Sequence, residues 1–301
     1  MKVLITGGAG FIGYHLAKEL SENHEVSIVD FKSKIEKIKL SRDIKAYRSD
    51  ISSEEAFESI PRDFNIIVHC AAQTGGYYSL LDPRKDAMWN SVGTSNLVNF
   101  SKKCIDLERV IYTSSMAVYG EGLKRSESDN LSPISFYGCS KLSGEFYFKS
   151  LKAQSDIDYV ILRLWNTYGP GQDMENKHQG MLSIYLDQAL KGDIVKITGS
   201  KNRIRDFVHV DDVVSAIKIC MEKDEASNQI FNICSGEEST SEDIITEIGS
   251  QLGKNLSIEE ISGYVGDQQY SSGNNDKIIK IGWKVSRSLR EGISEFIGSL
   301  I

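Results

Sequence analysis

The segment FYGCSK, residues 136–141, places a phenol and an amine four positions apart, at Tyr137 and Lys141. On a helix, residues i and i+4 lie on one face, so these two side chains would be neighbours. An ammonium group stabilises a phenolate and lowers the pKa of the tyrosine from its ordinary value of about 10. Such a phenolate can remove the proton of an alcohol while a hydride leaves the same carbon. The alternative is a surface helix that carries an aromatic and a charged residue by chance.

Two serines end the apolar run that precedes this pair. The run RVIYTSS, residues 109–115, predicts a strand with Ser114 and Ser115 at its carboxyl end. In a parallel sheet that end of a strand faces the ligand crevice. A serine hydroxyl there can hydrogen-bond the oxygen of a reacting alcohol or ketone, whereas the alternative is an ordinary Ser-rich strand terminus.

A glycine-rich turn follows the first apolar run of the chain. TGGAGFIG, residues 6–13, spaces Gly7, Gly10 and Gly13 three apart, before a predicted helix. Glycine permits a tight turn and lets the backbone approach a pyrophosphate closely. The N-terminus of the helix offers free N–H groups and the positive end of its dipole to the same anion. The pattern therefore predicts a dinucleotide site, with a plain tight turn as the alternative.

An acidic residue in the expected place selects between the two nicotinamide dinucleotides. Asp30 ends the second apolar run, 17 residues after Gly13. A carboxylate at this point accepts hydrogen bonds from an adenosine ribose and repels a 2′-phosphate, so the sequence favours NAD over NADP. Lys32 and Lys34 would offset part of that repulsion.

Alternating apolar runs and helix-like segments must position these residues. The predicted strands are KVLIT, EVSIVD, KAYRSD, NIIVHCAA, RVIYTSS and YVILRL, and the predicted helices cover residues 11–22, 84–104 and 137–153. Such alternation is typical of a parallel sheet covered by helices on both faces. Continuous Val, Ile and Leu runs indicate strands buried on both sides. We predict an α/β fold with a Rossmann-type doubly wound parallel sheet, followed after residue 165 by a smaller C-terminal α/β substrate-binding lobe.

The bulk composition excludes several classes of function. The chain has 301 residues, and its net charge of -7 argues against nucleic acid as the main partner. Its apolar runs are too short for a membrane span, and the first one is too short for a signal peptide. The five cysteines are widely spaced and form no CxxC, which predicts neither a disulfide framework nor a metal site. We expect a protein of the reducing cytoplasm, without a membrane partner.

Taken in order, these motifs resemble those of the extended short-chain dehydrogenases/reductases, in particular the NAD-dependent nucleotide-sugar epimerases and dehydratases of the UDP-glucose 4-epimerase type. The likeness covers nearly the whole chain. It implies that Asp50 and Ile51 contact adenine, that HCAAQ at 69–73 lies along phosphate and ribose, and that Asn90 lies near nicotinamide. The implied cofactor residues are Gly7, Gly10, Phe11, Ile12, Gly13, Asp30, Asp50, Ile51, Ala71, Ala72, Gln73, Asn90, Ser114, Tyr137 and Lys141.

The resemblance also implies a catalytic set. Tyr137 would be the acid/base, Lys141 would lower its pKa and bind the nicotinamide ribose, and Ser115 would hold the reacting oxygen. Ser114 would support these three side chains without contacting the reacting oxygen. The implied substrate-binding residues are Thr74, Ser115, Tyr137, Asn166, Arg205 and Asp267.

The residues after Ser115 bear on the reaction. The family's dehydratases usually carry an Asp-Glu pair there and its decarboxylases a Glu, whereas this chain has Met116 and Ala117. Neither moves a proton, which favours epimerisation at C4 of a nucleotide-diphosphate sugar through a 4-keto intermediate. The alternatives are a nucleotide-sugar reductase or decarboxylase, or a non-catalytic NAD-sensing protein. His69 and His209, each within an apolar strand, are expected to be packed rather than catalytic.

Two departures from the family concern the nucleotide pocket. Tyr264 stands where the family often has a phosphate-binding Arg, three places before Asp267, and Gly180 stands where an Asn is usual. Tyr264 could stack on a base or bond a phosphate oxygen. Lys201 or Arg203 would supply the missing charge, unless each is a solvated loop residue. The sequence therefore does not identify the base of the nucleotide. The loop GGYYSL, residues 75–80, is expected to border the sugar.

The resemblance finally implies a domain division and a homodimer. Residues 1–165 would form the NAD-binding domain, to which 206–235 returns, and residues 166–205 and 236–301 would form the substrate lobe. The helix after residue 84 and the helix that carries Tyr137 would pair with those of a second copy. FSKKC and EFYFKSL provide apolar side chains for this contact, although a buried face within the monomer would explain the same residues.

Overall fold

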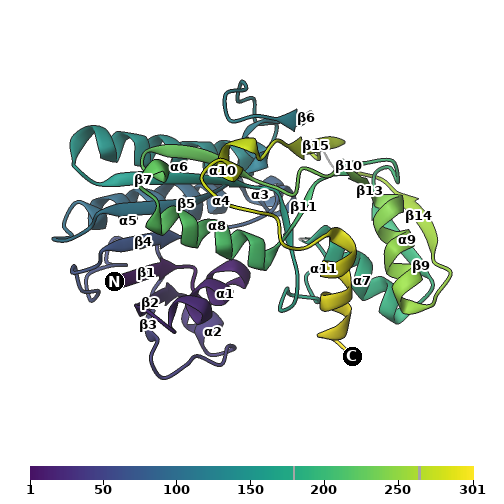
Figure 1. Cartoon of the computed structure of the whole chain (residues 1–301), viewed down its shortest axis with the longest axis horizontal. Coiled ribbons are helices and arrows are strands. Elements are labelled where there is room, and N and C mark those ends of the chain that lie inside the picture. Colours follow the sequence, from purple (N-terminus) through teal and green to yellow (C-terminus); the bar gives the residue numbers. More distant parts are fainter. Residues whose placement is uncertain (179, 264–265) are drawn as a thin grey trace.

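A computed structural model of the chain describes residues 1–178, 180–263 and 266–301 (Figure 1). Seven strands form its main sheet: β1 (Lys2–Thr6), β2 (Glu25–Asp30), β3 (Lys45–Arg48), β4 (Ile66–His69), β5 (Arg109–Ser115), β7 (Asp158–Leu164) and β12 (Gln229–Ile233). Their order is β12-β7-β5-β4-β1-β2-β3, and all pairs are parallel. The order reverses between β1 and β4, which opens a crevice at the carboxyl ends of the strands. The predicted doubly wound α/β class is confirmed.

Both faces of this sheet are buried under helices. Along β1, Val3 and Ile5 point into one core while Leu4 points into the other, as the twofold alternation of a strand requires. The first core is covered by α1 (Phe11–Leu20) and α8 (Val210–Glu222), and the second by α5 (Gly93–Ser101) and α6 (Phe136–Gln154). Each fully buried aliphatic side chain contributes about 1.5–3 kcal/mol, so the strand ends at the crevice have a rigid base.

The predicted helices occur with one irregularity. The helix predicted over 84–104 consists of α4 (Pro83–Ala87), the π-helical turn η1 (Met88–Val92) and α5. Asp82 starts it by accepting the Lys85 N–H at 2.9 Å, and proline at the first position needs no such partner. The helices predicted over 11–22 and 137–153 are α1 and α6. Among the described residues, no helix has both the length and the apolarity needed to cross a membrane.

A smaller lobe lies to the right in Figure 1. It contains α7 (Met181–Lys191), α9 (Ser241–Leu252), α11 (Leu289–Gly298) and the parallel pair β9 (Ile194–Thr198) and β14 (Ser257–Ile261). Its apolar core joins these helices to β9. Capping boxes start two of the helices, with Thr240 and Asp243 at α9 and Ser288 and Glu291 at α11.

Short elements connect the two lobes. The four-stranded sheet has the order β13 (Ser239–Thr240), β10 (Ile204–Arg205), β15 (Tyr270–Gly273) and β6 (Gly122–Arg125), and a separate pair joins β8 (Asn166–Tyr168) to β11 (Phe207–His209). The remaining helices are α2 (Lys32–Ile35), α3 (Gly76–Leu81), η2 (Met116–Val118), η3 (Asp224–Ala226) and α10 (Asp276–Ile279).

The chain passes between the lobes repeatedly. β12 pairs with β7 in the main sheet, whereas β6 pairs with β15 in the small sheet. Ile278 and Trp283, far beyond residue 235, are buried in the core under α1 and α8. The predicted division at residues 165, 205 and 235 stays a prediction. The segments that cross between the lobes are shorter than the predicted ones: β6 joins the small sheet, and Ile278 and Trp283 lie in the main core.

Candidate active site

The glycine turn between β1 and α1 has three glycines with different reasons for lacking a side chain. Gly7 has a φ of +70°, and a Cβ there would lie 2.5 Å from the Ala71 nitrogen. A Cβ on Gly13 would overlap the Gly7 carbonyl, so both glycines allow close packing of the turn. A Cβ on Gly10 would meet the Gly7 oxygen alone, at 3.1 Å. Among the described residues no side chain caps α1, and the turn around Gly10 therefore has the room and the N–H groups that a pyrophosphate needs.

This difference predicts separate effects for two matched substitutions. Gly10→Ala should change the free energy of unfolding by less than about 1 kcal/mol, yet weaken NAD binding tenfold or more, because its methyl group enters the space for the ligand. Gly13→Ala should destabilise the fold by about 1–3 kcal/mol through the overlap with Gly7. Denaturant unfolding and titration calorimetry with NAD measure the two effects. Parent-like NAD affinity in Gly10→Ala would contradict the assignment.

The acidic residue after β2 lies at the same turn. Asp30 accepts the Ala9 N–H at 3.0 Å and the Phe31 N–H at 2.8 Å, one on each carboxylate oxygen. Burial raises the pKa of its carboxyl, against these two hydrogen bonds. Each oxygen keeps a further lone pair, which suits the two hydroxyls of a ribose.

The other predicted adenine contacts have structural partners as well. Asp50 accepts both the N–H and the hydroxyl of Ser52, at 2.9 and 2.8 Å. Ile51 is buried against Gly93, where a Cβ would lie 2.7 Å from its side chain. These contacts fix the segment after β3, and direct contact with a cofactor stays a prediction for both residues.

Two of the three predicted catalytic side chains, Ser115 and Tyr137, meet at the carboxyl end of β5. The Ser115 hydroxyl lies close enough to the phenol of Tyr137, on α6, to affect its pKa. Ser115 Oγ also accepts the Ala117 N–H at 3.2 Å, which orients it at the strand end. Lys141, only 2% exposed, lies one turn further along α6, with its Nζ 4.3 Å from the centre of the Tyr112 ring. The arrangement suits transfer of a proton at an alcohol oxygen.

The predicted lowering of the Tyr137 pKa is wrong for the protein alone. Burial raises the pKa of Tyr137 to about 12, the Ser115 hydroxyl opposes this, and the charge of Asp86 adds to it. Burial also lowers the pKa of Lys141 to about 8, although Cys70 and Asp86 oppose that shift. Removal from water disfavours the charged form of each group, and it is the largest cause of both shifts. The amine is still mostly protonated at pH 7.

Two buried serines hold the backbone of Tyr137. Ser79 Oγ, on α3, accepts the Tyr137 N–H at 3.1 Å, and Ser140 Oγ donates to the Tyr137 carbonyl at 3.0 Å. Ser135 caps the same end of α6 by accepting the Gly138 N–H. The loop at 75–80 is predicted from the sequence to border the sugar, and Ser79 within it is an additional residue that the structure identifies. Nothing in the sequence marks that serine, because its partner lies 58 residues away.

The Asn90 side chain forms several hydrogen bonds within the protein. Its side chain is buried in η1 and bonds the backbone of Gln73 twice, at 2.8 and 3.0 Å, and Ser140 Oγ at 3.0 Å. Asp86 Oδ1 lies 3.1 Å from the same Nδ2, so the two N–H groups of Asn90 are shared among three oxygens, and contact of Asn90 with the cofactor stays a prediction. Gln73 differs, because its Oε1 is buried without a hydrogen-bond partner in the described part of the chain. That orphan acceptor suits a bound ligand.

Ser114 also points away from the crevice. Its hydroxyl donates to Glu145 Oε1 at 2.7 Å. Glu145 in turn forms a fully buried ion pair with Arg163, with Nη2 and Oε2 2.8 Å apart. Ser114 faces α6, on the same side of the sheet as Tyr112, whereas Ser115 is the last residue of β5 and reaches Tyr137 at the strand end. The Ser114 hydroxyl therefore supports α6, and contact of Ser114 with the cofactor stays a prediction.

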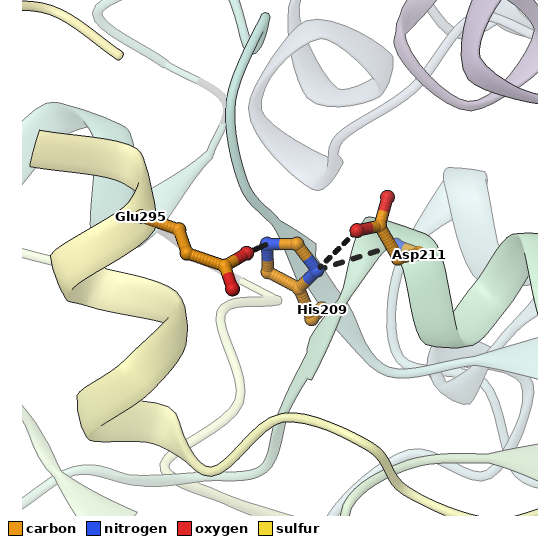
Figure 2. A group of neighbouring side chains, drawn as sticks. All are labelled: His209, Asp211 and Glu295. Carbon is orange, nitrogen blue, oxygen red and sulfur yellow. Dashed lines mark hydrogen bonds and ion pairs between the residues drawn. The ribbon is translucent and has the colours of Figure 1, made fainter. Parts of the chain in front are cut away.

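The two histidines are packed, as the sequence suggests. His69 lies between the hydroxyls of Thr6 and Thr94, at 2.6 and 2.9 Å, and burial lowers its pKa to about 3. His209 Nδ1 accepts the Asp211 N–H at 3.3 Å and starts α8. Figure 2 shows Asp211 and Glu295 at opposite nitrogens of its ring, 3.6 and 3.8 Å away. Arg287 pairs with both carboxylates, at 3.8 Å from Asp211 and 2.7 Å from Glu295, so the cluster has a cation of its own.

The predicted substrate residues gather around β8, β10 and the segment before β15. Asn166 Nδ2 donates to the Asp206 carbonyl at 2.9 Å, which leaves its oxygen for another partner. Arg205 and Arg203 both contact Asp267, at 3.4 and 2.5 Å. Arg203 Nε is buried without a hydrogen-bond partner among the described residues.

The other residues considered for substrate binding lie in different surroundings. Thr74, half-buried after β4, accepts the Gln73 side-chain N–H at its carbonyl. Lys201 pairs with Glu242 at the surface, so Arg203 is the better candidate for the missing charge. Gly180 starts α7 with a φ of +86°, a conformation that favours glycine over asparagine. Tyr264 lies outside the described residues.

A parallel doubly wound sheet with a glycine turn, an acidic residue after its second strand and a Ser-Tyr-Lys set at its crevice defines a nicotinamide-dinucleotide enzyme fold. The family model described as the NAD dependent epimerase/dehydratase family matches residues 3–234. The chain belongs to this family, and the predicted family and cofactor are confirmed.

Individual relatives match over their full lengths. A putative UDP-glucose 4-epimerase of Methanocaldococcus jannaschii is 32% identical, over 98% of this chain and 97% of its own. The crystal structure of UDP-glucose 4-epimerase from Thermotoga maritima, with UDP-glucose, has a TM-score of 0.92 at 33% identity and covers 100% and 98% of the two chains. A mutant UDP-glucuronic acid 4-epimerase from Bacillus cereus, in complex with a fluorinated UDP-glucuronic acid and NAD, has a TM-score of 0.92 at 26% identity and covers 100% and 99%.

Proposed function

We propose that this chain is an NAD-dependent epimerase that inverts C4 of a nucleotide-diphosphate sugar, with UDP as the nucleotide. The observation that carries the proposal is the contact of Tyr137 with Ser115 at the crevice of the sheet, with the buried Lys141 one turn further along α6. UDP is supported by the UDP-sugars in the structures of similar epimerases.

The chain's own residues handle the proton and the substrate. Tyr137 takes the proton of the C4 hydroxyl and gives it back after the keto-sugar has presented its other face. Ser115 holds the reacting oxygen, and the buried Lys141 ammonium favours the phenolate. Bound NAD would supply a positively charged hydride acceptor that later returns the hydride, with no net consumption. Gly7, Gly10 and Asp30 would hold it.

Two residues after Ser115 support epimerisation over loss of water. Met116 and Ala117 form the start of η2, and neither side chain transfers protons. Met116 Sδ instead accepts the Ser271 hydroxyl at 2.9 Å. Elimination and decarboxylation would each lack the acidic group that the related enzymes usually place here.

The substrate's diphosphate would lie at Arg203 and Arg205. Two guanidinium groups share the single carboxylate of Asp267, so one positive charge is left over. The unpaired Arg203 Nε offers a donor for a phosphate oxygen. Binding energy at this distance from C4 would position the sugar for reaction.

The proposed function is tested with UDP-glucose and UDP-glucuronic acid, each incubated with purified protein and no added cofactor. We expect a product of unchanged mass that separates chromatographically from the substrate, and NAD in the denatured protein. Stoichiometric use of added NADH would instead identify a reductase, and release of carbon dioxide a decarboxylase. Binding of NAD without conversion of any nucleotide sugar would favour the alternative of a non-catalytic NAD-sensing protein.

We also propose a homodimer in the cytoplasm. Met88 and Val92 on η1, and Phe146 and Tyr147 on α6, expose apolar side chains to solvent. The cysteines are free thiols, which suits a reducing compartment. Phe146→Ser should convert a dimer to a monomer in light scattering, with unchanged circular dichroism. A parent chain that is monomeric at micromolar concentration would overturn the dimer.

A further inference from the structure

A buried carboxylate lies beneath the proposed catalytic helix. Asp86, on α4, is 1% exposed, and its Oδ1 accepts the Asn90 Nδ2–H at 3.1 Å. In the described ranges 1–178, 180–263 and 266–301, no lysine, arginine or histidine nitrogen forms a salt bridge with it. A buried acidic group costs stability unless it is paired or neutral, so an unpaired one beside a reactive site calls for a functional reason.

A chain of hydrogen bonds links Asp86 to Tyr137. Asn90 Nδ2 donates to Ser140 Oγ at 3.0 Å, and Ser140 Oγ donates to the Tyr137 carbonyl at 3.0 Å. The Asp86 carboxylate also interacts with the Ser140 hydroxyl. The register of α4 and η1 against α6 therefore sets where the phenol stands.

The Asp86 carboxylate also affects the ionisation of Tyr137 and Lys141. Its negative charge raises the pKa of both Tyr137 and Lys141. It thereby keeps the amine protonated against the effect of burial and opposes formation of the phenolate. The other titratable groups around the pair are Glu145 on α6, Tyr112 on β5, and His69 and Cys70 at the end of β4.

We propose that Asp86 is a positioning residue that holds Tyr137 through Asn90 and Ser140 and sets the pH at which the tyrosine begins to act. The inference rests on the proposed role of Tyr137 as acid/base. It gives a reason for an acid at a site where packing alone would favour an apolar residue.

The test is Asp86→Asn, which keeps an acceptor for Asn90 and removes the charge. We expect the acid limb of kcat against pH to move to lower pH, because the pKa of Tyr137 falls without the neighbouring negative charge. At a pH on that limb, the rate relative to the plateau should rise. Asp86→Ala should shift the limb similarly and also lower the plateau, since the hydrogen bond to Asn90 is lost. An unmoved limb in both variants would overturn the proposal.

A matched control and a second readout separate this result from general damage. Asp212 is equally buried, but its Oδ1 accepts the N–H and hydroxyl of Ser286, remote from the pair. Asp212→Asn should leave the limb in place. Tyrosine ring-carbon NMR, with the Tyr137 resonance assigned from Tyr137→Phe, reports its titration without any turnover. A shifted resonance in an inactive protein would overturn the proposed epimerase function and support the role of Asp86. An active enzyme with an unshifted resonance would support the epimerase function and overturn the role of Asp86.

Discussion

Replacing Tyr137 with phenylalanine is expected to lower the turnover of a nucleotide sugar by about 10²–10⁴-fold. The ring stays on α6, where its backbone is held by Ser79 and Ser140, so the fold should not change. The lost oxygen is the one that meets Ser115 and would carry the proton. NAD should stay bound, because the glycine turn and Asp30 are untouched.

The measurement compares initial rates of epimerisation and the NAD released on denaturation. Tyr159→Phe is the matched control, since Tyr159 lies in β7 and bonds Asn228 through its backbone: its N–H donates to the Asn228 side chain at 3.3 Å, and its carbonyl accepts the Asn228 N–H at 2.8 Å. The control should retain the parent rate. A Tyr137→Phe enzyme within threefold of the parent would remove the tyrosine from the chemistry.

Changing Glu145 to glutamine is expected to lower the free energy of unfolding by about 3–5 kcal/mol. The side chains of Glu145 and Arg163 are 0% and 1% exposed, and two hydrogen bonds of 2.9 and 2.8 Å join them. An amide keeps the shape but leaves the Arg163 charge buried without its partner. That uncompensated charge, rather than the lost contact, is the main cost.

Denaturant unfolding measures this loss, and Glu19→Gln is its control. Glu19 pairs with Lys218, but the two side chains are 46% and 39% exposed. Water screens such a pair, so its removal should cost at most about 1 kcal/mol. Equal losses in the two variants would mean that burial does not decide the strength of the Glu145–Arg163 pair.

Local patterns in the sequence were sufficient for the sheet and for the residues that meet at its edge. The positions of these residues follow from spacing along strands and helices, which can be read from the sequence. They are Gly7, Gly13 and the set Ser115, Tyr137 and Lys141. The sign of the Tyr137 pKa shift was mispredicted because the burial of a side chain depends on segments distant in the chain. Asp86 and Asn90 are four residues apart on a predicted helix, and that spacing was an unused signal.

Adjacent serines illustrate the same limit. Ser114 and Ser115 are chemically identical, and only the packing of β5 against α6 decides which one meets Glu145 and which one meets Tyr137. Asn90 likewise has the residue type of a ligand contact, but a π-helical turn aims it at Gln73 and Ser140. Such directions follow from tertiary contacts that no short motif encodes.

The exchange of segments between the lobes has a consequence for how this molecule could be divided. Trp283 donates its indole N–H to the Asp212 carbonyl at 3.0 Å from within the main core, while β6 leaves the N-terminal half to complete the small sheet. A fragment cut after residue 235 would lose the indole that fills its interior and leave β6 without a neighbour. We therefore expect the two halves to unfold together as one cooperative unit.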